Sequence, residues 1–185
     1  MSSIVLNGDT SGSVTLSPPA VAGTQTVTLP AATGTVMVSG NMPAFSVYQG
    51  TSQTISPAVF TKVQLNVELF DTANAFDSTT NYRFQPTVAG YYQINTTVRI
   101  KINGTFNQMQ GAIYKNGTAF TAQNWSWTFD ASNYQSIPLS ETIYLNGSTD
   151  YLELYAIVNT SGTATMDAYS TVYTCKMSGA LMRTA

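Results

Sequence analysis

Two residue types that carry much of enzyme chemistry are scarce in this sequence of 185 residues. Histidine, the commonest general base near neutral pH and the commonest metal ligand, is absent. The single cysteine, Cys175, excludes a disulfide within the chain. We expect Cys175 to be a small buried apolar residue of a strand over residues 171–177, and a bridge between chains is the alternative.

Charged residues are also scarce. They make up 9% of the chain, against about 25% in ordinary soluble domains, and the formal net charge is −2. The few basic residues form no cluster that would neutralise phosphates, so nucleic acid is not an expected partner. Ser, Thr, Asn and Gln supply the polar surface instead, and this composition is common among extracellular and viral β-proteins.

Long apolar runs and targeting signals are missing as well. No run reaches the length of a transmembrane helix, so a membrane is not an expected partner. The start, Met1-Ser2-Ser3-Ile4, lacks the basic segment of a secretory signal peptide. We therefore expect a protein that is made and kept in a cytoplasm. Together with the virus-like surface, this favours a virion component assembled inside its host cell.

Residues 1–42 contain no aromatic residue and one charged residue, Asp9. Short alternating runs at residues 14–16, 27–29 and 36–38 are each bounded by Gly or Pro, and none can bury enough surface to fold alone. We predict an attachment arm over residues 1–42 and a head domain over residues 43–185. A flexible leader is the alternative. The arm residues expected to pair as strands on a neighbouring protein are Val14, Leu16, Val27 and Leu29.

A period of two runs through residues 91–101 and predicts a strand with one buried and one polar face. We expect it to be the central strand of the head, ended by Asn103-Gly104. Gly90, directly before it, is expected to allow a tight turn or a positive φ. The buried face is expected to carry Tyr92, Ile94, Thr96, Val98 and Ile100, and Leu152 and Leu154 are predicted to join the same core.

The rest of the head predicts strands throughout, and no segment has helical periodicity. Asn116-Gly117 is the strongest short hairpin signal, and Asn146-Gly147 marks another turn. Turn signals recur about every dozen residues, which indicates an all-β, two-sheet sandwich. The other expected strands cover residues 44–49, 62–70, 108–115, 118–129, 134–145, 151–158, 163–170 and 171–182.

A family resemblance adds a specific topology. The segment Phe-Gln-Pro-Thr-Val-Ala-Gly-Tyr-Tyr at residues 84–92 resembles the signature of the complement C1q and tumour necrosis factor jelly rolls. Residues 44–47 resemble the first strand of such heads, residues 112–117 their central hairpin and residues 177–181 their closing strand. The resemblance implies a jelly-roll β-sandwich preceded by an extended arm with short strands. It also implies a homotrimer that binds other molecules through exposed loops.

The strand expected at residues 151–157 is apolar on both faces apart from Glu153. One face can fill the sandwich, and the other needs a second cover, because such a patch is rarely left in water. In the resembled fold this strand lies beside the Tyr91 strand and near the trimer axis, which implies a pair between Glu153 and Arg99 within or between subunits. The predicted trimer interface is Tyr151, Glu153, Tyr155, Ile157 and Arg99.

Trp125 and Trp127 share one face of an expected strand, and Tyr134 is expected across the hairpin from them. Because a pyranose stacks on an indole ring, these three residues form a candidate ligand platform. The alternative is a pair of core tryptophans. This alternative is favoured by the polar residues on the other face, Asn124, Ser126 and Thr128.

The acidic residues show no catalytic arrangement. A glycosidase needs two carboxyl groups that face one sugar, and nothing marks Glu68 and Asp71 as such a pair. Asp71 and Asp77 bracket a loop that could hold Ca²⁺, but the spacing of a calcium loop is missing, so solvated loop acids are favoured. We expect no enzyme activity, no cofactor and no metal.

The leading hypothesis is a structural virion protein of a tailed bacteriophage, namely a short fibre, a tail-associated protein or a capsid-decorating protein. Residues 1–42 resemble the N-terminal attachment segments of phage tail fibres and other virion proteins, so the arm would bind other virion proteins. The trimeric head would then be exposed to bind a host-surface glycan or protein. The alternative is a ligand-binding, lectin-like module of bacterial or host origin.

Overall fold

The computed structural model describes residues 3–24, 26–28, 31, 33–34, 36–38, 40, 42–168 and 174–185, without the side chains of residues 127 and 129–132. The regular elements of this part of the chain are strands. It contains no helix that is long and apolar enough to cross a membrane. The chain forms two compact units, Met1–Gly34 and Thr35–Ala185, and each is described by itself below.

The first unit contains a β-hairpin. β1 (Ile4–Asn7) pairs antiparallel with β2 (Ser13–Leu16), and the Gly8 amide donates to the Gly12 carbonyl at 3.0 Å to close the turn. The predicted strand at residues 14–16 is confirmed, and its partner here is a segment of its own chain. Val27 and Thr28 form no strand, nor do residues 36–38, while Leu29 lies outside the described residues.

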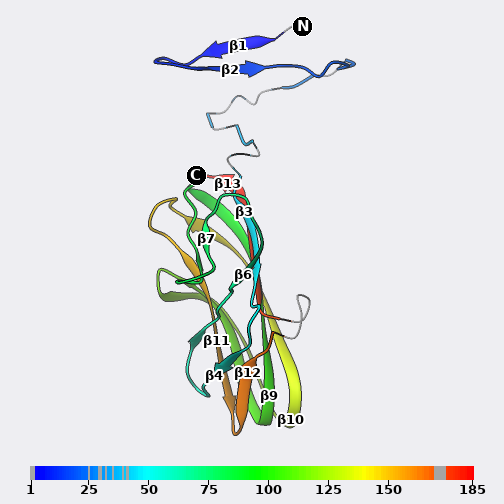
Figure 1. Ribbon diagram of the computed structural model, residues 1–185, viewed down its shortest axis with the longest axis vertical. Coiled ribbons are helices and arrows are strands. Elements are labelled where there is room, and N and C mark those ends of the chain that lie inside the picture. Colours follow the sequence, from blue (N-terminus) through cyan, green and yellow to red (C-terminus); the bar gives the residue numbers. More distant parts are fainter. Residues whose placement is uncertain are drawn as a thin grey trace. The chain divides into compact units, whose positions relative to one another are not determined.

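The second unit, which contains the head expected over residues 43–185, is a β-sandwich (Figure 1). Its two longest strands form one hairpin, which turns at Asn116-Gly117 as predicted. The strands of the head are β3 (Ala44–Tyr48), β4 (Gln53–Ile55), β5 (Thr61–Lys62), β6 (Val67–Asp71), β7 (Phe76–Asp77), β8 (Arg83–Phe84), β9 (Gly90–Lys115), β10 (Thr118–Leu145), β11 (Leu152–Thr160), β12 (Thr163–Met166) and β13 (Lys176–Thr184).

β9 belongs to both sheets of the sandwich. On one side, residues 90–97 of β9 pair with β13 and residues 101–103 pair with β12, whereas residues 106–115 pair with β11. Gly104 lies between the two halves with a φ of 118°, and a Cβ there would come within 2.9 Å of the Gly162 nitrogen. The predicted end of the strand at Asn103-Gly104 is therefore wrong, because glycine lets the backbone change direction without leaving the ladder.

This continuity defines the order of both sheets. In the first sheet β6, β3, β13 and the first half of β9 are neighbours in that order, and β4 and β12 extend it. In the second sheet β7, β8, β11 and the second half of β9 are neighbours, and β5 also pairs with β11. β10 follows β9 along its whole length and is an edge strand of both sheets.

The core lies between the two sheets and is apolar and aromatic. The Phe45 ring stacks on Phe84 at 4.1 Å between centroids, and Phe84 meets the edge of Tyr92 at 5.4 Å. The Tyr92 hydroxyl donates to the Val88 carbonyl at 2.7 Å, which satisfies its polar atom within the core. The predicted alternation is confirmed, since the fully or almost fully buried residues include Tyr92, Ile94, Thr96, Val98, Ile100, Leu152 and Leu154.

Gly90 serves a purpose other than the predicted turn. It is the buried first residue of β9 and is not among the residues with positive φ. A Cβ at this position would collide with the carbonyl oxygen of Arg183 in the paired strand β13. The interpretation as a tight turn is thus wrong, and glycine is needed because two backbones approach each other closely.

Two further segments differ in extent from the sequence prediction. The expected strand at residues 62–70 is divided into β5 and β6, because Gln53 holds the intervening backbone: its side chain accepts from the Gln64 amide and donates to the Lys62 carbonyl. Cys175 is fully buried as expected, directly before β13, and burial raises its pKa to about 12. Residues 169–173, part of the strands expected there, lie outside the described residues.

Replacement of the central core tyrosine tests this packing. Tyr92→Ala should lower the free energy of unfolding by about 3–5 kcal/mol, because it leaves a cavity among Phe45, Phe84 and the strands around them. Guanidinium denaturation measures the change. Phe120→Ala is the matched control, since Phe120 is 51% exposed and its loss should change stability by only about 0.5 kcal/mol. Equal effects of the two variants would contradict the burial of Tyr92 in the core.

Candidate functional site

Trp125 and Tyr134, two residues of the candidate ligand platform, point to different sides of the β9–β10 hairpin. Trp125 is the cross-strand partner of the fully buried Met109 and packs, half-buried, against the core. Tyr134 is the cross-strand partner of the exposed Lys101 on the outer face of the first sheet. Because cross-strand partners share a face, the two rings do not form one surface. The side chain of Trp127 lies outside the described residues.

Tyr134 is held by polar contacts on the outer face of the first sheet. The Arg99 guanidinium carbon lies 3.8 Å from the centroid of its ring, and the Lys101 ammonium lies 5.7 Å from it. Its hydroxyl donates to Asp167 Oδ2 at 2.9 Å, and the Ser52 hydroxyl donates to the other oxygen of that carboxylate at 3.1 Å. A cation therefore already covers a ring face that a sugar would need for stacking.

Much of the outward face of β11, predicted to need cover from another subunit, is covered by its own chain. Tyr155 stacks on Tyr114 with ring centroids 4.0 Å apart, and the Arg83 guanidinium lies 4.5 Å from the Tyr151 centroid. Ile157 on the same face is half-buried. The apolar pattern of this strand thus has an intramolecular explanation, and its role in a trimer interface stays a prediction.

Glu153 pairs with Lys62 rather than with Arg99. The Lys62 ammonium lies 2.5 Å from Glu153 Oε1, and Glu153 is only 5% exposed. β11 pairs with the second half of β9, so Glu153 is opposite Tyr114 in one sheet while Arg99 belongs to the other. The predicted pair of Glu153 with Arg99 within a subunit is therefore wrong, since the two halves of β9 have different neighbours.

Asp71 and Asp77 shape the loops that follow them. Asp71 Oδ2 accepts from the amides of Ala75 at 2.6 Å and Phe76 at 2.7 Å. Asp77 accepts from the amides of residues 79, 80 and 81, and these backbone hydrogen bonds hold the pKa of its carboxyl well below the usual range. Amide dipoles aimed at both carboxylates disfavour a cation. In the described part of the chain, no group of three acidic or cysteine side chains could hold a metal ion.

The outer face of the first sheet carries an uncharged surface that no single strand of the sequence reveals. Two cross-strand rows span β3, β13, β9 and β10, and we call their eight residues the neutral face. Side-chain hydrogen bonds of 2.8–2.9 Å connect Asn95 with Ser140, Ser140 with Gln93, and Gln93 with Thr142. The rows consist of Ser46, Ser178, Asn95 and Ser140, and of Ala44, Ala180, Gln93 and Thr142.

Apolar groups border the neutral face. The rings of Tyr91 and Tyr144 contact each other at 5.4 Å and are 45% and 40% exposed. A hollow of about 310 Å³ opens over the β3 and β13 side of the face, where Phe70 and Met182 form part of the wall. Exposed aromatic groups around an uncharged patch of a sheet are typical of a surface that contacts another protein.

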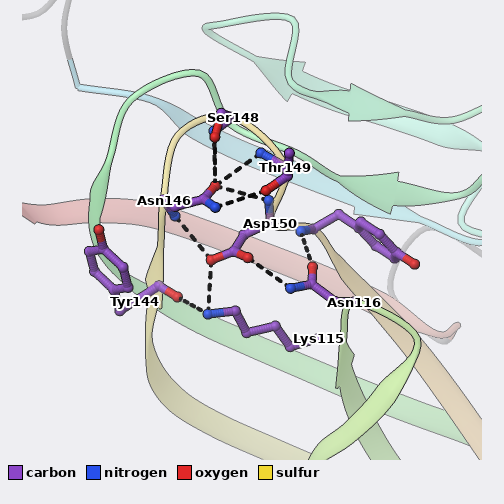
Figure 2. A network of polar contacts seen from close by, with 8 residues as sticks. Lys115, Asn116, Tyr144, Asn146, Ser148, Thr149 and Asp150 are labelled. Carbon is purple, nitrogen blue, oxygen red and sulfur yellow. Dashed lines mark hydrogen bonds and ion pairs between the residues drawn. The ribbon is translucent and has the colours of Figure 1, made fainter.

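A polar network joins the turn between β9 and β10 to the loop before β11 (Figure 2). The carboxylate of Asp150 accepts from the Asn116 side chain at 2.7 Å, from Lys115 at 2.9 Å and from the Asn146 amide at 3.1 Å. The Asn116 hydrogen bond, with help from Lys115, lowers the pKa of Asp150. The Asn146 side chain in turn accepts from the backbone amides of residues 148, 149 and 150. The network therefore fixes the loops at this end of the head.

The structure describes three of the four arm residues that were predicted to pair with a neighbouring protein. Val14 and Leu16 lie on β2 opposite Leu6 and Ile4, so these four apolar side chains share one face of the hairpin. Each of the four is between 56% and 62% exposed. Val27 is exposed outside any strand.

Comparisons with known proteins agree on the fold. No family model matches the sequence, and no curated protein matches it. The structure is similar to the globular domain of zebrafish complement 1qA protein, with a TM-score of 0.50, 14% identity and coverage of 77% of this chain and 99% of that one. Murine APRIL at pH 5.0 gives a TM-score of 0.56, 8% identity and coverage of 76% and 99%.

A third similar structure is the Eiger TNF from S. frugiperda, with a TM-score of 0.56, 9% identity and coverage of 78% of this chain and 93% of that one. At these identities the likeness shows the fold alone. It confirms the predicted all-β jelly roll of the C1q and tumour necrosis factor type for the head.

The Asp150 network predicts a pH-dependent stability. A carboxylate with a lowered pKa stabilises the folded state above its unfolded pKa of about 4, and this contribution is lost as the pH falls through the folded pKa. Asp150→Asn should therefore lower the free energy of unfolding by about 1–3 kcal/mol at neutral pH, with a smaller difference in acid. Denaturant titrations at neutral and at acid pH measure this difference in the free energy of unfolding, with Asp9→Asn as the control. A difference that grows in acid would contradict this role.

Proposed function

We propose that this protein is a non-enzymatic structural component of a tailed-bacteriophage virion: a short fibre, a tail-associated protein or a capsid-decorating protein. The observation that carries the proposal is the division of the chain into a jelly-roll head with a complete core and a separate N-terminal unit whose apolar side chains are exposed. The head would face outward and bind, while the arm would attach it to the particle.

The arm supports this division of roles through its energetics. A two-stranded hairpin is marginally stable in water by itself, and burial of a valine or leucine side chain contributes about 1.5–3 kcal/mol. All four apolar side chains of one hairpin face are exposed, so a partner that covers this face would supply this stabilisation. Within the described residues β2 pairs only with β1, which leaves a strand edge that a partner protein can extend.

The head is proposed to act as a homotrimer. The support is the jelly-roll fold, because the sequence resemblance to C1q and tumour necrosis factor heads implies trimers, together with the neutral face. Interface cores are poor in charge and rich in aromatic residues, and the neutral face with Tyr91 and Tyr144 has this composition. We place the main subunit contact on the neutral face. The outward face of β11, with Tyr151, Glu153, Tyr155 and Ile157, is the alternative contact.

A lectin-like module outside any virion is the second candidate function. It is favoured by the rigid loops of the head, which are fixed by the networks of Asp150, Asp71 and Asp77 as loops that recognise ligands require. The two functions differ in what the arm does, because a free lectin would bind its ligand without residues 1–42.

Self-association can be tested on both candidate contacts. Light scattering should show a trimer at micromolar concentration. Ala180→Arg adds an unpaired charge at an exposed position of β13, an inner strand of the neutral face, and should give monomers with an intact fold. The matched control, Ile157→Arg on the outward face of β11, should remain trimeric. A monomeric wild type would remove the trimer, and dissociation of the Ile157 variant alone would transfer the contact to β11.

Attachment through the arm predicts selective proteolysis. Limited digestion of the free protein should remove the arm up to about residue 42 and leave the head, whereas assembled particles should protect the arm. A variant without residues 1–42 should keep its folded head and lose incorporation into particles, as measured by mass spectrometry of purified virions. Protection of the arm in an isolated monomer, or normal incorporation of the shortened protein, would contradict the attachment role.

A further inference from the structure

A polar hollow of about 500 Å³ lies between β6 and the loops that carry β7 and β8. It is separate from Trp125 and Tyr134, the residues of the candidate platform. Most of its lining is polar and includes Glu68, Asn74, Asp77, Thr79, Arg83 and Gln85.

The walls of the hollow are fixed by the protein itself. Asp71 and Asp77 each bind three backbone amides of the loop that follows, and Phe76, only 6% exposed, anchors β7 in the core. Asn74 has a left-handed backbone with a φ of 52°, and the surrounding hydrogen bonds maintain it. The hollow therefore has its shape before any ligand binds, which lowers the entropic cost of binding.

The lining offers both hydrogen-bond donors and hydrogen-bond acceptors. Glu68 accepts from the Ser78 hydroxyl through Oε1 at 2.6 Å, and its second oxygen remains an acceptor. The Arg83 guanidinium carbon lies 4.5 Å from the centroid of the Tyr151 ring, and its N–H groups are hydrogen-bond donors. Gln85 donates to the Ser148 carbonyl at 2.9 Å, and this contact orients its own carbonyl oxygen as an acceptor.

The mixed charge of the hollow selects the class of ligand. An anion would meet the carboxylates of Glu68 and Asp77, and a cation would meet Arg83 and the amides gathered around Asp77. An apolar ligand would find Phe76 as the main apolar group, and Phe76 is almost fully buried. A neutral polyhydroxy compound can use donors and acceptors together, since each hydroxyl both donates and accepts.

We propose that this hollow binds a neutral saccharide unit, with Glu68 accepting from its hydroxyls and with Asn74 and Arg83 donating to its oxygens. The inference rests on the binding role proposed for the head and names the ligand class of that role. It places recognition on the side of the head near β6, β7 and β8 rather than on the ring of Tyr134.

A printed array of neutral, sialylated and sulfated oligosaccharides tests the ligand class with the full-length protein. A neutral oligosaccharide should bind, and its affinity is then measured by NMR titration. Glu68→Gln and Asn74→Gly should each weaken binding by about tenfold or more, as expected for loss of a hydrogen bond to a charged or fixed polar group. Glycine accepts the left-handed backbone at position 74, so Asn74→Gly should keep the fold.

Two variants serve as controls. Ala58→Gly replaces another residue with positive φ outside the hollow, and Tyr134→Ala removes the ring of the candidate platform. Both should bind as the wild type does. The proposal is overturned if no neutral oligosaccharide binds, if acidic ones bind better, or if Tyr134→Ala loses binding while Asn74→Gly keeps it. Light scattering and particle incorporation are measured in parallel. A protein that forms a trimer and enters the virion but binds no sugar would refute the saccharide site and leave the proposed function unchanged.

Discussion

The head depends on the continuity of β9 through Gly104. One strand contributes its first half to the sheet of β13 and its second half to the sheet of β11, so the two sheets cannot separate without breaking a ladder. β10 follows it as the edge strand of both sheets. That edge carries two features that discourage pairing with foreign strands: the exposed Pro138, and the charge of Glu141, which lies opposite the inward-facing Ile94.

The same arrangement decides which surfaces remain for function. The outward side of β11 is largely occupied by its own chain, through Tyr155 on Tyr114 and Glu153 on Lys62. On the outward side of the first sheet, the two rows of the neutral face carry no charge and are partly or fully exposed. The loops around Asp71, Asp77 and Asp150 are fixed by hydrogen bonds from backbone amides to these carboxylates. Assembly and ligand recognition can therefore use different parts of the head.

The sequence could predict which residues of a strand are buried, because burial follows local periodicity. It could predict little about which strands are neighbours. Alternation identified Tyr92, Ile94 and Leu154 as core residues because burial of one strand face follows a period of two. The predicted pair of Glu153 with Arg99 was wrong because β11 pairs with only the second half of β9. Arg99 lies in the first half, and Gly104, between the halves, is where β9 passes from one sheet to the other. The neutral face needs four strands in register, so no one segment shows it. The loop roles of Asp71 and Asp77 had a usable signal, since Asp before Thr, Ser or Ala in a turn-rich stretch often accepts from the amides that follow.

Distances between subunits give the most direct test that the neutral face forms the contact. Cys175 is fully buried and its pKa is raised to about 12, so a nitroxide can be attached to an added cysteine without removing the native one. Double electron–electron resonance then measures the distance between nitroxides on different subunits of the full-length protein. A label at Ser140→Cys should give one short distance, and a label at Ile157→Cys should give a longer one. Absence of dipolar coupling at residue 140, or a shorter distance at residue 157, would contradict assembly through the neutral face.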